Sequence, residues 1–398
     1  MKCRYASSHL DFKKGGYAPC FRFKNTSDVQ RHNYWMGSGS DKLPSQVINN
    51  KDFQDVREQL RNDIWPAGCV DCKTQEEAGM SSYRTRSLDN AMDYSPVDYD
   101  SNIVVIKDLQ LKMSRACNYT CRHCDSASNS SFEKLGRQFP EIENELKTKY
   151  QFSHISPAGD KKIIIPTDEV MEDLYENVFP TIEQLEFSGG EPFYQIEMYK
   201  VLQRLIDHPN IDTTKMRLVY NSNMSQLTHK GYSVKELFPH FGQVHITVSM
   251  DGTGKLFEYF REGGNWDNVI NNIKEIAPLV TQFLFVCTTS SYQAFYMNEI
   301  YKDLTELKES IPETRVQIRA TFVHWPKAMD IVNLEEETKT KIMETLEIND
   351  FTKEFAIRMT SSDNEIEPCF KGLVKTQDLL YDRSCEEGAP KIYEYVCN

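Results

Sequence analysis

One stretch decides the fold: LQLKMSRACNYTCRHCDS, residues 109–126. It holds three cysteines at the spacing C-x3-C-x2-C, namely Cys117, Cys121 and Cys124. The apolar residues ahead of them alternate with polar ones, which predicts a strand with one buried face over residues 109–113. A helix is expected to follow over residues 126–135. The sequence therefore predicts a strand that delivers three thiols to a loop at its C-terminal end.

Three thiolates in one loop indicate a metal site, because Cys thiolates hold iron–sulfur clusters and zinc. Three ligands leave one coordination position free, and a free position permits catalysis. The spacing favours an iron–sulfur cluster. Structural zinc stays open, with His123 or a distant residue as its fourth ligand.

Length and composition bound the class of protein. The chain has 398 residues, enough for two or three domains. No apolar run approaches the roughly 18 residues of a membrane span, and the N-terminus lacks the apolar segment of a secretory signal. We therefore expect no membrane partner and a cytoplasmic protein, in which eleven cysteines indicate metal ligation rather than disulfides. The net charge of −13 argues against nucleic-acid binding.

A second cysteine set lies in the first hundred residues: Cys3, Cys20, Cys69 and Cys72. The first two enclose Gly15, which permits a tight turn, and the last two form a C-x2-C pair. From the residues alone, a shared cluster, a zinc ribbon and cysteines without a common site all stay open.

The rest of this region predicts one helix and two polar connections. The apolar residues of segment 48–60 fall on one helical face. Residues 36–46 are rich in Gly, Ser and Pro and predict a loop, and residues 85–100 predict a linker into the next domain.

From residue 101 to 330, strand-like and helix-like runs alternate. Six strands are predicted, over residues 109–113, 184–187, 216–220, 244–250, 282–287 and 315–322. Six β/α repeats imply an α/β fold with a parallel sheet, and six are too few to close an eight-stranded barrel. We therefore predict a partial (β/α)6 TIM-like barrel with a surface excursion over residues 137–166.

The last segment, residues 331–398, predicts a short helical C-terminal extension. It contains three isolated cysteines that we interpret as free thiols, Cys369, Cys385 and Cys397. Cys287, at the end of the fifth predicted strand, is predicted to be a buried core thiol.

Polar residues follow the C-terminal ends of the predicted strands, where barrel chemistry gathers. In chain order they are Gly189, Gly190, Glu191, Pro192, Asn223, Ser249, Asp251 and Arg261. The two glycines let the backbone approach a ligand, and Glu191 can accept hydrogen bonds from an ammonium group. An ordinary strand-to-helix turn over residues 189–192, a turn residue at Asp251 and a surface arginine are the alternatives.

The three-cysteine loop followed one β/α unit later by Gly-Gly-Glu resembles the radical S-adenosylmethionine (SAM) superfamily, with His123 in place of the usual aromatic residue. The resemblance implies a [4Fe–4S] cluster on the three cysteines, with SAM chelated at the fourth iron. It also implies SAM contacts within residues 189–192 at the amino group, from Ser249 and Asp251 at the ribose, and from Arg261. Asn223 falls at a family turn. A Gly-x-Ile-x-Gly contact to adenine, found in some relatives, is absent.

The N-terminal cysteine spacing is similar to the auxiliary-cluster "twitch" module, a shortened relative of the SPASM domain. Here it precedes the barrel, within residues 1–100. The segment from Glu76 to Arg84 resembles the E-x-G-x-S-x-R ending of that module, with one extra residue. The resemblance implies an auxiliary [4Fe–4S] cluster on Cys3, Cys20, Cys69 and Cys72.

The resemblance implies reductive cleavage of SAM to a 5'-deoxyadenosyl radical, which takes a hydrogen atom from a substrate. A peptide, a protein or a small polar metabolite is the expected substrate class. The auxiliary cluster would bind substrate or accept an electron, and a flavodoxin or ferredoxin would supply electrons. The alternatives are a zinc-stabilised binding protein without catalysis and a radical SAM fold retained as a scaffold.

Overall fold

The structure is a computed structural model that describes residues 1–13, 16–24, 43–77, 79, 81–88, 95–155, 166–360 and 366–397. Several predicted features lie partly or wholly outside the described residues. They are the Gly15 turn, most of the loop over residues 36–46, two residues of the Glu76–Arg84 segment, six residues of the linker and residues 156–165 of the predicted excursion.

An eight-stranded sheet organises the molecule. Its strand order is β12-β11-β9-β6-β5-β3-β1-β2, and all neighbours are parallel except the final pair. The strands are β1 (His9–Lys13), β2 (Gly16–Ala18), β3 (Asp108–Leu111), β5 (Gln184–Phe187), β6 (Arg217–Ser222), β9 (Gln243–Ser249), β11 (Gln282–Thr289) and β12 (Arg315–Phe322). The six predicted barrel strands are confirmed, each within two residues at either end. They lie side by side in chain order, as expected for a partial TIM-like barrel.

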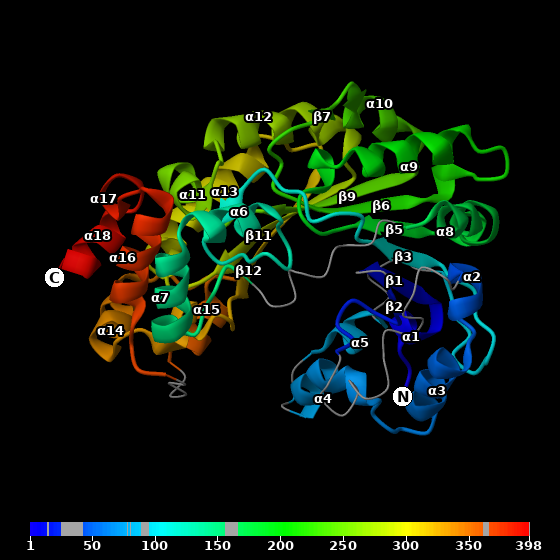
Figure 1. Ribbon diagram of the computed structural model, residues 1–398, viewed down its shortest axis with the longest axis horizontal. Coiled ribbons are helices and arrows are strands. Elements are labelled where there is room, and N and C mark those ends of the chain that lie inside the picture. Colours follow the sequence, from blue (N-terminus) through cyan, green and yellow to red (C-terminus); the bar gives the residue numbers. More distant parts are fainter. Residues whose placement is uncertain are drawn as a thin grey trace.

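One face of the sheet is apolar and covered by helices. Phe187 on β5 and Tyr220 on β6 stack with ring centroids 5.6 Å apart, and the Tyr220 hydroxyl lies 3.8 Å from Met198 Sδ of helix α9 (Ile196–Asp207). Alternate residues of β6, β9 and β11 are buried on this side. Figure 1 shows α8, α9, α10 and α12 along it.

The opposite, interior face carries polar side chains, which are partly exposed on β6, β9 and β11 and buried on β1 and β3. Asp11, Gln110 and Glu186 lie in register across β1, β3 and β5. Glu186 Oε1 accepts hydrogen bonds from Gln110 Nε2 at 2.8 Å and from Asn221 Nδ2 at 3.0 Å. Polar side chains on this face, in a fold whose other face is packed, indicate a surface for ligands rather than for a core.

The helices surround this sheet. They are α1 (Arg4–Ser8), α2 (Pro44–Val47), α3 (Lys51–Arg61), α4 (Val70–Glu77), α5 (Tyr83–Arg86), α6 (Ser131–Gln138), α7 (Pro140–Tyr150), α8 (Asp168–Asp173), α10 (Val234–Leu237), α11 (Gly254–Phe260), α12 (Trp266–Ile276), α13 (Met297–Glu309), α14 (Glu336–Thr345), α15 (Lys353–Met359), α16 (Phe370–Tyr381), α17 (Cys385–Gly388) and α18 (Pro390–Cys397). The predicted N-terminal helix is α3, and it buries Phe53, Val56 and Leu60 on one face.

The N-terminal region joins the main sheet. The β1–β2 hairpin pairs β1 with β3 in parallel, so residues 9–12 lie beside residues 108–111. In Figure 1 the N-terminal helices gather around this end of the sheet, and the C-terminal helices lie at the β11–β12 end. Strands β1 and β3, which lie near the N-terminal cysteines and the three-cysteine loop respectively, therefore pair within one continuous sheet.

The segment after the three-cysteine loop differs from the predicted surface excursion. Within its described part, α7 packs against α16 of the C-terminal extension. Leu146, Phe152 and His154 are each at most 1% exposed. The charged residues of this segment hid its apolar contacts from the sequence pattern, because the partner helix lies more than 200 residues further along the chain.

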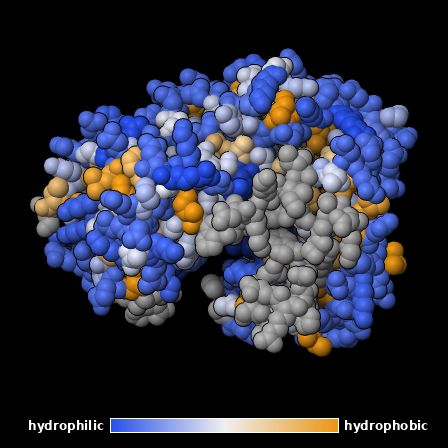
Figure 2. All heavy atoms as spheres, in the orientation of Figure 1, coloured by the Kyte–Doolittle hydropathy of each residue, from blue (hydrophilic) through white to orange (hydrophobic). Residues whose placement is uncertain are grey.

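The visible surface is mostly hydrophilic, with small separate groups of hydrophobic residues (Figure 2). Among the residues that the structure describes, no helix is both long and apolar enough to cross a bilayer.

Candidate functional site

The three-cysteine loop lies at the C-terminal end of β3 and is tied to a distant segment. Its short strand β4 (Thr120–Cys121) pairs antiparallel with β10 (Arg261–Glu262), which sets Cys121 opposite Arg261. The Arg122 amide also donates to the Phe260 carbonyl at 3.0 Å. The loop and the Arg261 segment, 140 residues apart, therefore form one unit.

The three cysteines are partly or fully buried. Cys121 is buried, and Cys117 and Cys124 are half-buried. Burial, followed by the charge of Cys121, raises the pKa of Cys117 to about 12, and burial likewise raises the pKa of the other two thiols. A bound cation offsets such a cost by replacing the protons, which is the behaviour of metal ligands.

The Gly-Gly-Glu turn lies directly against the cysteine loop. Gly190 has φ +54°, and a Cβ there would lie 2.2 Å from the Ala116 carbonyl oxygen. The Glu191 amide donates to the same carbonyl at 2.9 Å, and the Gly190 amide donates to the Ser128 carbonyl at 3.1 Å. Only glycine allows this close approach. Gly189 precedes it with φ +82°, and Pro192 begins the short 3-10 helix η6 (Pro192–Tyr194).

Glu191 is held by three donors. Its carboxylate accepts from Ser222 Oγ at 2.8 Å, from the Asn223 amide at 2.6 Å and from the Phe193 amide at 3.0 Å. Burial raises its pKa to about 7, against the lowering effect of these donors. Ser222 was not predicted as a site residue, although it directly precedes Asn223 at the end of β6.

Asn223 joins this carboxylate to the loop. Its Nδ2 donates to Asn118 Oδ1 at 3.1 Å and lies 3.9 Å from Cys117 Sγ. The turn after β6 therefore contacts the cysteine loop directly through the Asn223 side chain. It also contacts the loop indirectly through Glu191, whose carboxylate accepts from the Asn223 amide.

Asp251 and Arg261 form a buried pair beside Cys121. Arg261 Nη2 donates to Asp251 Oδ2 at 2.6 Å, and Arg261 Nη1 lies 3.5 Å from Cys121 Sγ. The Thr288 amide donates to Asp251 Oδ1 at 2.8 Å. Both carboxylate oxygens are thus engaged by the protein, and Asp251 orients Arg261. Ser249, the last residue of β9, lies on the half-exposed interior face.

His123 lies beside this pair. Its ring stacks on Phe260 with centroids 5.1 Å apart, and its Nε2 is 3.9 Å from Asp251 Oδ2. Burial lowers the pKa of His123, against the raising effect of Asp251, and so favours the neutral form of the ring. Phe260 had no motif that could have marked it in the sequence.

The residues at this edge fit an iron–sulfur cluster with a bound ligand. Three thiols converge with an arginine against one sulfur, and a glycine backbone lies where no side chain fits. Two buried polar atoms at the site, His123 Nδ1 and Arg261 Nε, have no hydrogen-bond partner among the described residues. Buried polar groups are normally satisfied, so these atoms point to a ligand. The predicted residues Glu191, Asn223, Asp251 and Arg261 all lie beside the three-cysteine loop.

The second cysteine set lines a single cavity. Cys3, Cys20, Cys69 and Cys72 border it, together with Trp65, Tyr83 and Arg84. Cys3 and Cys20 flank the β1–β2 hairpin, and Gly68 lies against the Phe23 ring, where a Cβ would come within 2.4 Å of ring atoms. The topology therefore gathers four thiols that the sequence spreads over 70 residues.

The electrostatics of these thiols reflect their proximity. Burial raises the pKa of Cys3 to about 11 and of Cys20 to about 12, and the charges of neighbouring cysteines add to each shift. Arg84 Nε donates to Glu76 Oε1 at 2.9 Å, and Ser82 Oγ donates to the same atom at 2.5 Å. Arg84 and Ser82 therefore both contact Glu76, whereas the E-x-G-x-S-x-R pattern with one extra residue falls on Glu77 and Ser81. In the described part of the chain, neither cysteine set has the spacing of a single-ion site.

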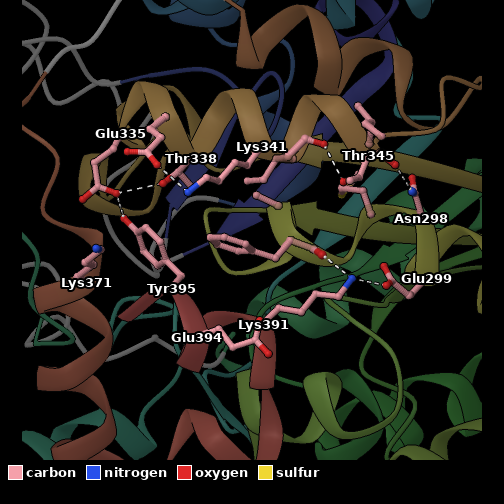
Figure 3. A pocket seen from close by; sticks show the side chains of 16 residues that line it. Asn298, Glu299, Glu335, Thr338, Lys341, Thr345, Lys371, Lys391, Glu394 and Tyr395 are labelled. Atoms are coloured by element: carbon pink, nitrogen blue, oxygen red, sulfur yellow. Dashed lines mark hydrogen bonds and ion pairs between the residues drawn. The ribbon is translucent and has the colours of Figure 1, made fainter. Parts of the chain in front are cut away.

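A larger pocket, of about 870 Å³, lies between α13, α14 and α18. Several of its charged and polar groups interact with one another: Lys391 with Glu299, Lys341 with Glu337 and the Tyr395 hydroxyl with Glu335. Figure 3 shows the contacts of Lys391 and Tyr395.

The four remaining cysteines form no disulfide with another described residue. Cys287 is fully buried, as predicted, and Cys385 is buried against the C-terminal helices. Cys369 is half-buried and Cys397 is exposed.

Fold and site together define an α/β protein with a thiol-rich ligand site at the C-terminal edge of a parallel sheet. Residues 111–289 match the family model described as the Radical SAM superfamily. The segment that contains the three-cysteine loop and strands β5 to β11 is therefore similar to the radical SAM superfamily, whose members use a [4Fe–4S] cluster and SAM for radical chemistry.

A curated relative is the radical SAM cyclopropyl synthase TigE of Paramaledivibacter caminithermalis, 24% identical over 175 residues. The match covers 44% of this chain and 33% of that protein, so the chain matches about a third of the relative's length.

Among solved structures, anSMEcpe with bound AdoMet is 17% identical with a TM-score of 0.38, covering 70% of this chain and 62% of that one. Streptococcus suis SuiB bound to S-adenosylmethionine is 13% identical with a TM-score of 0.37, covering 75% and 60%.

Proposed function

We propose that this protein is a radical SAM enzyme that removes a hydrogen atom from a polar substrate and passes an electron to an auxiliary cluster. One observation carries the proposal: Arg261 contacts both Cys121 of the three-cysteine loop and Asp251 after β9, so the predicted cluster and SAM residues share one buried site. When bound, a [4Fe–4S] cluster with SAM supplies the electron that cleaves the sulfonium and yields the 5'-deoxyadenosyl radical.

The residues of the chain divide the binding task. Cys117, Cys121 and Cys124 would hold the cluster. Glu191, oriented by three donors, would accept hydrogen bonds from the SAM ammonium group. Arg261 places a cation against the cluster, where it can pair with the SAM carboxylate. Asp251 fixes the direction of that guanidinium.

The N-terminal cysteines would hold the auxiliary cluster. All four border one cavity, and aromatic rings and the Arg84–Glu76 pair complete its wall. Four thiolates satisfy the four irons of a [4Fe–4S] cluster and leave no iron open to substrate. The geometry therefore favours electron acceptance over substrate binding for this cluster.

The substrate would contact the interior face of the sheet. Gln110, Glu186 and Asn221 form a hydrogen-bonded row there, on strands β3, β5 and β6. This row suits a peptide or a small polar metabolite with hydrogen-bonding groups. A flavodoxin or ferredoxin would supply electrons, and the reducing cytoplasm would keep the thiolate ligands available.

Metal analysis and nucleoside release test the proposal. Protein purified without oxygen is expected to carry about eight irons and eight sulfides per chain. Incubation with SAM and dithionite should release 5'-deoxyadenosine, measured by chromatography. One or two zinc ions per chain would contradict the proposal and favour a binding protein. Full iron loading without any nucleoside release would favour a scaffold.

A further inference from the structure

A buried arginine sits inside the three-cysteine loop, between Cys121 and Cys124. Arg122 is 0% exposed, and its guanidinium lies 3.9 Å from the centroid of the Tyr259 ring. Arg122 Nε donates to the Tyr259 carbonyl at 3.0 Å, and Arg122 Nη2 lies 2.9 Å from Asp378 Oδ1 of α16. The charge partner of this loop residue therefore comes from the C-terminal extension.

The residue before Asp378 contacts the backbone of the same loop. Gln377 Nε2 donates to the Arg122 carbonyl at 2.8 Å, and Gln377 Oε1 accepts from the Tyr292 hydroxyl at 2.7 Å. Gln377 Nε2 also lies 3.4 Å from Nε2 of His154, whose Nδ1 is 2.8 Å from the Cys124 carbonyl oxygen. Gln377 contacts one loop carbonyl directly and a second through His154.

Asp378 is itself fixed in place. Its carboxylate accepts from the Tyr259 hydroxyl at 2.6 Å and from the Cys385 amide at 3.0 Å. A buried guanidinium is costly unless a hydrogen-bonded anion accompanies it. Arg122 can therefore keep its position, and the loop its shape, only while α16 is docked.

We propose that helix α16 is part of the cluster-binding apparatus: Asp378 and Gln377 hold Arg122 and so fix the Cys117–Cys124 loop in its ligand-ready shape before a cluster binds. Arg122, Gln377 and Asp378 are positioning residues. This inference rests on the proposed function for one point, that the ligand of the loop is an iron–sulfur cluster. The shape of the loop itself can be measured on protein without a cluster.

The test is the alkylation rate of individual cysteines in the cluster-free full chain, followed by mass spectrometry with iodoacetamide. Asp378→Asn removes the negative charge that pairs with Arg122, while the new side chain has nearly the same size and shape as the old one. It is expected to speed alkylation of Cys117, Cys121 and Cys124 by about tenfold, because thiol reactivity follows local opening of the loop. The four N-terminal cysteines serve as an internal reference and should keep their rates.

A matched control changes charge on the same helix without touching the loop. Lys375 is exposed on α16, and Lys375→Gln should leave all rates unchanged. Asp378→Glu should restore part of the protection, and Gln377→Ala should loosen the loop even where Asp378→Asn fails to accumulate. After reconstitution, Asp378→Asn should broaden the electron paramagnetic resonance signal of the reduced cluster at the three-cysteine site.

Two results would overturn the proposal. One is equal alkylation rates in Asp378→Asn, Gln377→Ala and Lys375→Gln together with an unchanged resonance signal. The other is a parallel rise at the N-terminal cysteines, which would show general unfolding rather than a local effect. Neither depends on SAM cleavage, so failure of the proposed function would register separately, as absent nucleoside release.

Discussion

The two cysteine sets lie near neighbouring strands of one sheet, β3 and β1, but have opposite surroundings. Around Cys117, Cys121 and Cys124 lie polar side chains from the ends of three other strands, including Glu191 and Arg261. Around the N-terminal cysteines lie aromatic rings and a self-paired Arg84–Glu76 contact. A site that must bind a changing ligand keeps polar groups directed at it, whereas a site that only holds a cluster can be closed by packing. The predictions below probe that difference, starting with the largest expected effect.

The first prediction removes one thiol from each set. Cys121→Ala is expected to abolish 5'-deoxyadenosine release, by roughly a thousandfold or more, because the site loses a ligand beside Arg261. Cys69→Ala should lose a similar amount of iron yet keep nucleoside release, since SAM does not bind there. Chromatography of the nucleoside and iron analysis check both variants. An equal loss of nucleoside release in both variants would contradict the claim that only the three-cysteine site binds SAM.

The second prediction compares two glycines, one in each region. Gly190→Ala combines a positive φ with a clash against a backbone carbonyl, so we expect a loss of about 3 kcal/mol in the free energy of unfolding. Gly68→Ala meets only the Phe23 ring, which can move, and should cost about 1 kcal/mol. Urea unfolding of both variants measures the difference. A larger loss at Gly68 would show that the N-terminal wall is the more rigid one.

The third prediction exchanges the arginine of each region for lysine. Arg261→Lys keeps the positive charge but loses the planar guanidinium, whose two terminal nitrogens contact Cys121 and Asp251 at the same time. The affinity for SAM should therefore fall about tenfold. Arg84→Lys should change SAM binding by less than about twofold, because Arg84 faces the other set. Equilibrium dialysis with labelled SAM provides the measurement. Similar weakening in both variants would contradict the assignment of SAM to the three-cysteine site.

The fourth prediction concerns Glu186, which lies on β5 at the interior face of the sheet, next to Gln110 of β3. Burial, and then the charge of Asp11, raises its pKa to about 7. The folded state therefore binds this proton more tightly than the unfolded state, so its stabilising effect is full below about pH 4.5 and is lost as the pH rises through 7.

Replacing Glu186 by Gln removes that dependence. At pH 8, Glu186→Gln should be more stable than the wild type by about 1 to 2 kcal/mol, and near pH 4.5 the two should match. Urea unfolding at both pH values checks this, with the exposed Glu309→Gln as control. A variant that is less stable at pH 8 would show that the ionised carboxylate is held by contacts stronger than its burial cost.

Much of the fold could be predicted from local sequence. In the six barrel strands apolar residues alternate with others, as Val244, Ile246 and Val248 do. This alternation identifies a strand without knowledge of the elements that pack against it. The β1–β2 hairpin was missed, although Leu10 and Phe12 alternate with His9 and Asp11. Strand β1 spans only five residues and has two apolar positions, so its alternation is too short to distinguish it from a loop between the two cysteines.

The site was predictable where one short motif carries the chemistry, as in the three-cysteine loop and Gly189–Glu191. Its supports were not. Arg122 was a spacer residue in the motif, and its partners Gln377 and Asp378 lie 255 and 256 residues away. Asp251 was expected to contact the ribose, and the structure shows both its oxygens bonded to Arg261 and Thr288. Such pairings arise from topology and have no local pattern.

The parallel pairing of β1 with β3 has a consequence for how the chain can be cut. Deleting the first twenty residues would remove β1 from one side of β3 and leave an unprotected row of amide and carbonyl groups along that edge, next to Leu109 and Leu111. Exposed edges of this kind recruit other chains. A shortened protein would therefore be expected to precipitate as intermolecular sheets, rather than survive as a separate α/β domain without its N-terminal strands.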